Sequence, residues 1–478
     1  LLSMVNACAD ELEIETIQSS ITGTGLESDA GIGSALIYMY SKCGSLKNSY
    51  KVFCDFPMQD NCTLWNAMIA AFGRNGEGKQ ALQLFEQMKL QAILPDKMTF
   101  MSMLEAFQSA VHLPAAKWMH SAIVAASWES NTIVATALVN MYVNCNSLTD
   151  AWTTFVDMPN RDVISWTAVI NAHSQQGKWD EAFELFMNMQ EQGFEPDKVT
   201  FISILSACLT SFEGKHIHRL IVENGSDSNI VVANALLNMY SRCDCKEDAL
   251  RTFDKIEDYD IVAYSNIISA CANWAALSEG QQIHASIMGT ETETHISVGN
   301  ALLHLYGKCG SLKDAQVMFE KMHTRDTVTW SVMIAAHAQQ GEGRAAIKLF
   351  NKMQQEGIKP NEVTCIGILS ACNHDGLVDY ACQYFLSMSN MYGIVPVVDH
   401  YDCLIDLFAR AGRLDEAENL IKVMPFPSTI VSWTSFLNAC KLRVDIERGE
   451  YAAEQLFHQD PEHPGVYIIL SNLYIIAG

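Results

Sequence analysis

Hydrophobic residues between positions 163 and 197 recur at the spacing of two consecutive amphipathic helices. In the first half, one helical face is formed by Trp166, Val169, Ile170 and His173. In the second half, the same spacing is carried by Ala182, Leu185, Phe186 and Met189. Gly177 separates the two patterns, and Gly193 with Pro196 ends the second. Because one such hairpin is too short to enclose a core, the pattern predicts that further copies stack on it.

Two series of aromatic residues show that the hairpin is repeated. One series opens the leading helix and consists of Trp65, Trp166, Tyr264, Trp330 and Trp433. The other lies in the intervening segments and consists of Tyr40, Tyr142, Tyr240, Tyr306 and Phe408. Both series advance by about 101 residues, apart from one step of 66 residues. Units of about 35, 35 and 31 residues account for the long step, and loss of one unit accounts for the short step, so the sequence predicts a helical solenoid.

Three motifs of this stretch resemble a known repeat family. Trp-Thr-Ala-Val-Ile begins at Trp166, Glu-Ala-Phe-Glu-Leu-Phe at Glu181, and Gly-Phe-Glu-Pro-Asp at Gly193. They resemble the pentatricopeptide repeat of about 35 residues rather than the related tetratricopeptide repeat. The ordered alternation of unit lengths is similar to the land-plant PLS subfamily, with its P, L and S variants. The predicted fold is therefore an all-α, right-handed superhelical solenoid of tandem helix-turn-helix repeats.

The resemblance divides the chain into four segments. Residues 1–29 look like a partial L-type repeat, so the chain is expected to begin inside a repeat. Residues 30–429 form a tandem array of P, L and S-type repeats, in which unit 261–295 opens like a P unit and closes like an L unit. Residues 430–463 resemble the first extension motif of editing-type members. Residues 464–478 resemble the start of a second extension motif.

Charge gives a mixed indication about partners. The 478 residues include 31 basic and 55 acidic side chains, and a net charge of −24 argues against a polyanionic partner. Local charge matters more, because charges beyond a Debye length of about 8 Å are largely screened. Five basic residues share the thirteenth position of their units and are predicted to form a phosphate-contacting ridge: Lys42, Arg74, Arg242, Lys308 and Arg410. The alternative is a solvated helix end, where the helix dipole favours cations.

Neither a membrane anchor nor a targeting segment is visible in the sequence. No apolar run reaches the roughly 18 residues that a membrane helix requires, so no membrane association is expected. Because the chain is expected to start inside a repeat, the missing targeting segment says nothing about destination. The family resemblance implies the mitochondrion or the chloroplast.

Fifteen cysteines raise the question of a metal or disulfide site. Repeat register accounts for nine of them, which occupy the fourteenth position at Cys43, Cys145, Cys243 and Cys309 and the eleventh at Cys8, Cys208, Cys271, Cys372 and Cys440. Cysteines one repeat apart are separated by roughly 10 Å, too far for a shared metal ion or an S–S bond. They are predicted to be small buried packing residues, consistent with a reducing compartment.

The sequence contains no recognisable catalytic site. A zinc-dependent cytidine deaminase needs His-x-Glu followed by Cys-x-x-Cys. None of the 14 histidines has Glu two residues later, and Cys-x-x-Cys does not occur. His216 and His218 come nearest to a metal-binding pair, but packing on a polar helix face is the favoured interpretation. Catalytic residues, metal ligands and cofactors are therefore not predicted within these residues.

The functional signal lies in the fifth and last residues of each unit. The resemblance implies that each repeat reads one RNA base with these two side chains. The pairs in P and S units are Asn66 with Asp96, Thr136 with Asp162, Thr167 with Asp197, Asn234 with Asp260, Asn300 with Asp326, and Ser331 with Asn361. Helix N-capping explains Asp or Asn at the last position. It does not explain short polar residues at the fifth position, where the L units have Met101, Ile202 and Ile366.

By resemblance, Asn with Asp favours U, Thr with Asp favours G, and Ser with Asn favours A. The first S unit pairs Ser34 with either Asp60 or Asn61, which implies only a purine. Two further pairs have no clear assignment: Ser265 with His295, and Asp402 with Thr429.

These features predict a protein that binds one single-stranded organellar RNA and acts as the site-recognition factor for C-to-U editing. The deaminase would lie beyond Gly478, or residues 430–478 would recruit it or other editing factors in trans. DNA is not an expected partner. One alternative is an RNA-binding factor for transcript stability or processing without editing. A second alternative, from another class, is a peptide-binding scaffold of the tetratricopeptide type.

Overall fold

A computed structural model describes residues 11–21, 29–56, 62–256, 258–461 and 464–478. Within these residues all regular secondary structure is helical, which confirms the predicted all-α solenoid. The chain forms two compact units, Leu1–Ala235 and Leu236–Gly478, and the boundary falls within α15. No helix of the described residues is both long and apolar enough to cross a membrane.

The first unit contains the leading helices α3 (Ala30–Lys42), α5 (Cys62–Arg74), α7 (Lys97–Glu105), α9 (Thr132–Asn144), α11 (Val163–Gln175) and α13 (Lys198–Ala207). Their partners are α4 (Leu46–Asp55), α6 (Gly78–Leu90), α8 (Leu113–Ala125), α10 (Leu148–Asp157), α12 (Trp179–Glu191) and α14 (Ser211–Glu223). The remaining elements are α2 (Glu11–Ile21), the 3-10 helix η2 (Ala110–His112) and the start of α15 (Ile230–Arg242).

The second unit contains the leading helices α17 (Ile261–Asn273), α20 (Ile296–Lys308), α22 (Thr327–Gln339), α24 (Glu362–Asp375), α26 (Val398–Arg410), α28 (Ile430–Arg443) and α30 (Pro464–Ala477). The helices that follow them are α18 (Leu277–Ile287), α21 (Leu312–Lys321), α23 (Gly343–Gln355), α25 (Val378–Met391), α27 (Leu414–Val423) and α29 (Ile446–Gln459). Two other helices are α16 (Lys246–Asp254) and the short α19 (Glu291–Thr294).

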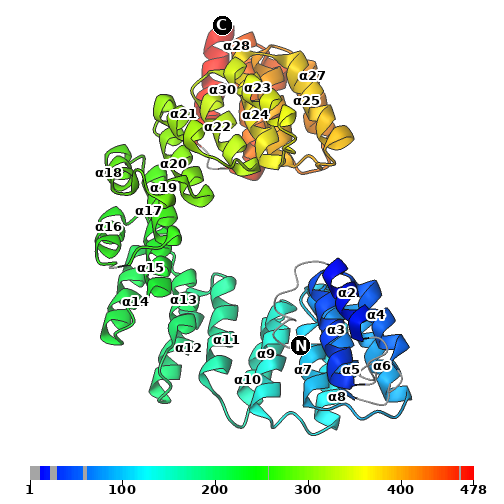
Figure 1. The fold of residues 1–478 in the computed structure, drawn as a ribbon. Coiled ribbons are helices and arrows are strands. Elements are labelled where there is room, and N and C mark those ends of the chain that lie inside the picture. The colour runs from blue at the N-terminus through cyan, green and yellow to red at the C-terminus, as the bar shows by residue number, and fades with distance from the viewer. Residues whose placement is uncertain (1–10, 22–28, 57–61, 257, 462–463) are drawn as a thin grey trace. The chain divides into compact units, whose positions relative to one another are not determined.

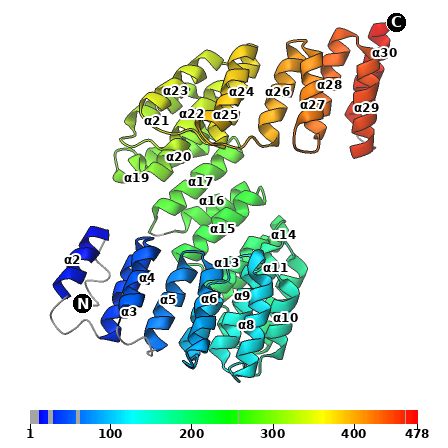
Figure 2. The same cartoon turned by 90° about the vertical axis from the view of Figure 1, so that its right-hand side faces the viewer.

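Each unit is built as two layers of helices (Figures 1 and 2). Successive leading helices pack directly against one another, as α3, α5 and α7 do in the first unit and α20, α22 and α24 do in the second. The following helix packs on its own leading helix and on the next one, as α4 does on α3 and α5 and α23 does on α22 and α24. Within each unit the leading helices therefore form one layer, and their N-terminal turns recur at regular joints.

The hairpin α11–α12 shows why the sequence folds in this way. Asp162 begins α11 by accepting the backbone N–H of Ser165 at 2.8 Å. Gly177 and Gly193, at φ values of +68° and +81°, follow the two helices in the left-handed region that favours glycine. The helices bury their predicted apolar faces, and Phe186 is fully buried, which stabilises the fold by about 1.5 to 3 kcal/mol.

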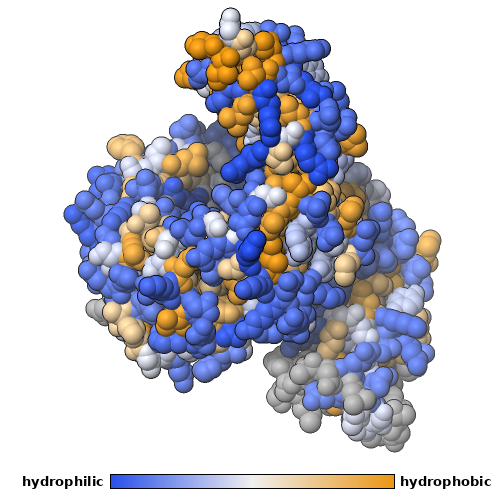
Figure 3. Space-filling model, turned by 90° about the horizontal axis from the view of Figure 1, so that it is seen from above, coloured by the Kyte–Doolittle hydropathy of each residue, from blue (hydrophilic) through white to orange (hydrophobic). Residues whose placement is uncertain are grey.

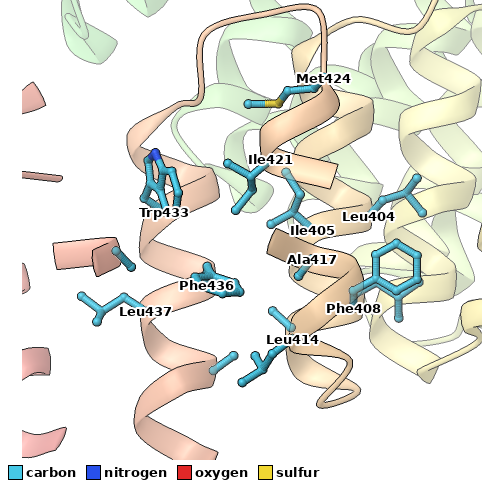
Figure 4. Packing of buried hydrophobic residues seen from close by; sticks show 14 of the residues in the cluster. Leu404, Ile405, Phe408, Leu414, Ala417, Ile421, Met424, Trp433, Phe436 and Leu437 are labelled. Atoms are coloured by element: carbon cyan, nitrogen blue, oxygen red, sulfur yellow. The ribbon is translucent and has the colours of Figure 1, made fainter. Parts of the chain in front are cut away.

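The core of the second unit near its C-terminus is continuous across hairpins (Figure 4). Leu404 and Ile405 of α26 share it with Ile421 of α27 and with Trp433 and Phe436 of α28. The leading helix α28 thus packs on the preceding hairpin in the same way as the earlier repeats do. Residues 430–443 continue the stack of the array.

The hybrid unit 261–295 has the length of a single repeat, although its two halves resemble different repeat types. It contains α17 and α18, and after Gly289 the single-turn helix α19 leads directly into α20. The leading helices α17 and α20 pack against each other, so the layer of leading helices continues without interruption across the short step. This arrangement fits the prediction that one unit is lost at this point of the chain.

Cysteine burial was predicted correctly at one repeat position and incorrectly at another. The eleventh-position residues Cys208, Cys271, Cys372 and Cys440 are buried, whereas Cys8 lies outside the described residues. At the fourteenth position only Cys145 is buried; Cys243 and Cys309 are half-buried and Cys43 is exposed. The prediction is wrong for these three because this position directly follows the leading helix, where the chain turns away from the packed layer.

Candidate nucleic-acid interface

The predicted base-reading residues lie where two successive leading helices meet. The fifth residue is in the second turn of one leading helix, and the last residue is the N-cap of the next, as Asp96 is for α7 and Asp326 for α22. Asp162, Asp197, Asp260 and Asn361 are N-caps in the same way. Capping therefore accounts for part of the preference at the last position, and it also holds each of these side chains in a fixed place.

Asn66 and Asp96 are in direct contact. The Asn66 side-chain amide donates to Asp96 Oδ1 at 3.0 Å. The same carboxylate oxygen accepts the backbone N–H of Thr99 at 2.8 Å and lies 3.0 Å from the Thr99 hydroxyl. Asn66 is half-buried and Asp96 is exposed, so the pair is anchored on one side and open to solvent on the other.

Asn300 and Asp326 form the corresponding pair in the second unit. The Asn300 amide donates to Asp326 Oδ1 at 3.3 Å, and the backbone N–H of Thr329 donates to the same oxygen at 2.8 Å. The Thr329 hydroxyl also lies 2.7 Å from the Asn300 carbonyl oxygen. Both pair residues are half-buried.

The pairs that contain a hydroxyl at the fifth position are more deeply set. Ser331 Oγ lies 3.5 Å from Asn361 Oδ1 and 2.6 Å from the hydroxyl of Thr364. Thr167 is linked to Asp197 through the hydroxyl of Thr200, which is 2.7 Å from Thr167 Oγ1 and 2.9 Å from Asp197 Oδ1. Asp197 itself is exposed, so in this pair the carboxylate is the group that reaches solvent.

Among the described residues, Thr136 and Asp162 are not joined in this way. Thr136 is buried, and its hydroxyl has no hydrogen-bond partner among the described residues, while Asp162 caps α11. Asn234 belongs to the first unit and Asp260 to the second, where Asp260 accepts the backbone N–H of Ala263 at 2.7 Å. Ser34 donates to the backbone of its own helix. Its two candidate partners, Asp60 and Asn61, lie outside the described residues.

The two pairs without an assigned base also differ from the rest. Ser265 donates to the backbone oxygen of Ile261 at 2.8 Å, whereas His295 caps α20 with its ring. Asp402 and Thr429 are in contact, with Thr429 Oγ1 donating to Asp402 Oδ2 at 3.0 Å. The terminal pair therefore has the same joint geometry: its last residue, Thr429, still caps the next helix, but its acidic residue is at the fifth position.

Asp96 and Asp326 are both held in the ionised form. Burial on its own would raise the pKa of Asp96, but hydrogen bonds from Thr99 and Asn66 outweigh it and lower the pKa. Burial likewise opposes a lowered pKa at Asp326, where hydrogen bonds from Thr329 and Asn300 prevail. A carboxylate that keeps its negative charge is an acceptor for donors on a base edge.

A row of exposed apolar residues next to these pairs was missed by the sequence analysis. It occupies the second position of nine leading helices: Met98, Ile133, Ile164, Val199, Val231, Val262, Val328, Val363 and Val431. These side chains are 48–63% exposed. Apolar residues interrupt the hydrophilic surface on the face that Figure 3 shows. The signal was present as a recurrent apolar residue, β-branched at every position except Met98, that lies outside the buried helical period.

The five basic residues of the predicted ridge are all exposed and end their leading helices. Arg74 lies over the ring of Tyr38, with its guanidinium carbon 4.5 Å from the ring centroid. Arg410 is 3.8 Å from a carboxylate oxygen of Asp406. Lys42, Arg242 and Lys308 occupy the same helix position. Phosphate contact by this set stays a prediction, because a helix C-terminus also favours cations for its own sake.

No group of three or more His, Cys, Asp or Glu side chains in the described parts of the chain is arranged to hold a metal ion. His216 packs edge-on against Phe183, with ring centroids 5.3 Å apart. His216 therefore takes part in aromatic packing.

Comparison with known proteins identifies the repeats. Models described as the PPR repeat family or the PPR repeat match residues 60–108, 161–210, 231–261, 300–326, 325–374 and 392–425. A mitochondrial pentatricopeptide repeat-containing protein of Arabidopsis thaliana is 32% identical over 93% of this chain and 70% of its own length. The chain belongs to the pentatricopeptide repeat family. A chloroplastic pentatricopeptide repeat-containing protein of the same plant is 31% identical over 99% of this chain, which spans 64% of that relative.

Solved structures of pentatricopeptide repeat proteins share the fold. The crystal structure of PPR10 from maize superimposes with a TM-score of 0.64 at 16% identity, covering 99% of this chain and 75% of PPR10. PPR10 in complex with an 18-nucleotide psaJ RNA element gives a TM-score of 0.51 at 15% identity, covering 94% of this chain and 82% of that one.

Proposed function

We propose that this pentatricopeptide repeat protein binds single-stranded RNA with one base per repeat. The observation that carries the proposal is the recurrent joint between leading helices, where Asn66 contacts Asp96 and Asn300 contacts Asp326. Each pair is anchored by a helix cap and retains polar atoms toward solvent. A single-stranded RNA with splayed bases is the partner that such regularly repeated polar pairs suit, because each base offers one hydrogen-bonding edge. The RNA in the PPR10 complex supports this assignment.

Within each joint, the paired side chains and the exposed apolar residues have different roles. The fifth and last residues meet the edge of the base. An exposed apolar side chain such as Val328 or Val363 offers a surface on which the face of a base stacks. The edge contacts select the base, whereas stacking adds affinity for any base.

Selection of bound RNAs from a random pool tests the base assignments. From unit 30 onward, with the RNA running 5′ to 3′ along the repeats, the pairs specify purine, U, any, G, G, any, U, any, U, A. The expected consensus therefore contains GG-n-U-n-U-A. Absence of a consensus, or a consensus unrelated to this one, contradicts the assignments.

A substitution at Thr167 tests one unit by itself. Thr167 is shorter than Asn, which leaves room for guanine to approach the exposed carboxylate of Asp197. Thr167→Asn is expected to shift the preference of this unit from G to U. A good bidentate base contact discriminates by about 1 to 3 kcal/mol in DNA complexes, so the shift is measurable with RNAs that differ at one base. An unchanged preference in a variant with an intact helical spectrum contradicts the register.

Salt titration tests the basic ridge. If Lys42 or Lys308 contacts a phosphate, replacement by Ala weakens binding to all RNA sequences alike and makes the salt dependence shallower by at most about one counterion. The same result is expected for Arg74, Arg242 and Arg410. An unchanged salt slope in all five variants assigns these residues to helix ends only.

The proposed biological role is recognition of a site for C-to-U editing in a mitochondrion or chloroplast. Support comes from the resemblance of residues 430–478 to extension motifs and from the mitochondrial and chloroplastic relatives. Sequencing of organellar cDNA with and without the protein tests it, and loss of editing a short distance 3′ of the bound element is expected. Unedited binding sites with altered transcript abundance would favour a role in stability or processing.

A further inference from the structure

A buried hydroxyl contacts the base-reading pair from the following repeat. It is the third residue of six leading helices: Thr99, Ser165, Thr200, Thr329, Thr364 and Ser432. All six side chains are completely buried. Each completes a capping box with the last residue of the preceding unit, so each has a structural role in starting its own helix. Four of them also reach the fifth residue of the preceding unit.

The hydroxyl of Thr329 fixes the orientation of the Asn300 amide. Thr329 Oγ1 accepts the backbone N–H of Asp326 at 3.2 Å and lies 2.7 Å from Asn300 Oδ1 and 2.9 Å from Asp326 Oδ1. A threonine hydroxyl has one proton, and the nearer acceptor is the amide oxygen. The Asn300 carbonyl is therefore held toward Thr329, and its amino group donates to Asp326. One amide N–H remains for a ligand.

The corresponding amide of Asn66 is not held in this way. Its carbonyl oxygen is buried without a hydrogen-bond partner in the described part of the chain. The Thr99 hydroxyl lies 3.0 Å from Asp96 Oδ1 and 3.6 Å from the Cys62 sulfur, and the Asn66 amino group lies 3.5 Å from the same sulfur. In the unit of Asn300 the first residue is Ile296, which has no polar atom to compete.

We infer that the third residue of the following repeat is a positioning residue that sets how strongly an Asn unit prefers uracil over cytosine. The inference rests on the proposed base-reading function. Uracil presents a carbonyl acceptor where cytosine presents an amino donor. An Asn amide that is held with its amino group outward donates to the carbonyl oxygen of uracil. Against cytosine, the same amino group faces another amino group, so two donors meet and no hydrogen bond forms. An amide that is not held in this way accommodates either pyrimidine, so the Asn300 unit discriminates more strongly than the Asn66 unit.

The test compares binding to RNA pairs that carry U or C at a single position. Thr329→Val keeps the shape of the side chain and removes the hydroxyl, and the U-over-C ratio at the base of unit 296–326 is expected to fall on the order of fivefold. Thr329→Ser restores the hydroxyl and is expected to restore the ratio. Thr99→Val is the matched control, because it removes the same cap but no bond to Asn66, and the preceding unit 62–96, which contains Asn66, should keep its ratio within about twofold.

A reciprocal variant keeps the test decisive if Thr329→Val loses helicity. Cys62→Ile places the residue type of the stronger unit beside Asn66 and frees the Thr99 hydroxyl from the sulfur. The U-over-C ratio of the Asn66 unit is then expected to rise toward that of the Asn300 unit.

The outcomes separate this inference from the base-reading proposal. If the wild-type protein does not distinguish U from other bases at these positions, the proposed function fails. If the wild type distinguishes U, but folded Thr329→Val and Cys62→Ile both keep the wild-type ratios, the positioning role is overturned. A fall in affinity without a change of ratio likewise overturns it, because lost capping alone weakens binding to both RNAs equally.

Discussion

Two junctions between repeats, one around His120 and one around His284, share a hydrogen-bonded pair but differ in its surroundings. His120 Nδ1 lies 2.8 Å from the Tyr142 hydroxyl, and His284 Nδ1 lies 2.6 Å from the Tyr306 hydroxyl. Each pair links the second helix of one hairpin to the next leading helix. Burial is the main cause that raises the pKa of both tyrosines to about 12. The two tyrosines are members of the aromatic series that defines the repeat.

Around His284 the network is closed by a buried carboxylate from α19. Glu293 accepts hydrogen bonds from His284 Nε2 at 3.1 Å, Lys321 Nζ at 2.8 Å and the backbone N–H of Gly289 at 2.8 Å. Burial would raise the pKa of Glu293, but these three donors outweigh it and lower the pKa to about 2. The charged carboxylate is stable here because each of its partners is in place.

Around His120 the equivalent positions carry two carboxylates. Glu129 and Asp157 occupy the places of Glu293 and Lys321 relative to the next leading helix. Both are exposed, and with His120 they line an open surface pocket. The difference teaches that two units of equal length, 261–295 and 97–131, end differently: the hybrid unit has a buried carboxylate paired with a lysine where the L unit leaves a solvated pocket. The ion pair ties α19 of the hybrid unit to α21 of the next unit.

Removal of the buried Glu293 carboxylate is expected to cause the largest loss of stability at either junction. Glu293→Ala leaves the N–H of Gly289, His284 and Lys321 without their acceptor and should destabilise the second unit by about 3 kcal/mol. Hydrogen exchange of α18, α19 and α20 measures the loss of protection. Glu129→Ala is the matched control at the exposed position, with an expected change within about 0.5 kcal/mol. Equal effects of the two variants would mean that burial of Glu293 contributes nothing.

Acid should weaken the same network without mutation. Because the pKa of Glu293 is depressed from 4.5 to about 2, its stabilisation is present above pH 4.5 and is lost as the pH falls from 4.5 to 2. The side chain of Lys321 is 42% exposed, so solvent screening limits the expected loss to about 2 kcal/mol. Glu293→Gln should show a flatter dependence of α20 protection on pH in this window. An identical slope in wild type and variant would assign the acid sensitivity to other carboxylates.

The junction around His120 should lose stability at a higher pH than the junction around His284. Burial lowers the pKa of His120, and the carboxylates of Glu129, Asp150 and Asp157 only partly oppose it. The folded state therefore favours the neutral ring, and stability declines as the pH falls through about 6.5, where the unfolded histidine takes up its proton. The effect is smaller than that of Glu293. Hydrogen exchange of α8 and α9 at pH 7.5 and 5.5 should detect it, and His120→Gln should abolish the difference.

The sequence predicted the repeat register well because periodicity and caps are local signals. The leading helices α11 and α20 begin directly after Asp162 and His295, where the register placed the unit ends. The polar pairs Asn66–Asp96 and Asn300–Asp326 were also predicted, and the structure brings each of them into hydrogen-bond contact. The hybrid unit was recognised from its two dissimilar halves.

The remaining features depend on contacts that a linear pattern does not encode. Thr329 has the same register and residue type as Thr99, yet only Thr329 bonds to the preceding Asn. Glu293 lies in a short polar stretch that reads as a loop, and its burial follows from the packing of α19 beneath Lys321 and His284. Exposure of fourteenth-position cysteines was misjudged because register alone does not show which side of a helix end faces solvent.

The smallest effect on stability is expected from building an ion pair like that of Glu293 and Lys321 into the junction around His120. Asp157→Lys places an ammonium group where the other junction has Lys321, opposite the carboxylate of Glu129. Because both positions are exposed, the new pair should add no more than about 1 kcal/mol to the stability of the first unit. It should also lower the pKa of His120 further, since Asp157 is one of the carboxylates that now raise it. NMR titration of the His120 ring measures this change, and Asp157→Asn separates loss of the negative charge from gain of the positive one. In 1 M salt, where the Debye length is about 3 Å, this electrostatic stabilisation should disappear. A stabilisation that persists in 1 M salt would come from packing of the lysine side chain rather than from its charge. The two junctions would then not be equivalent.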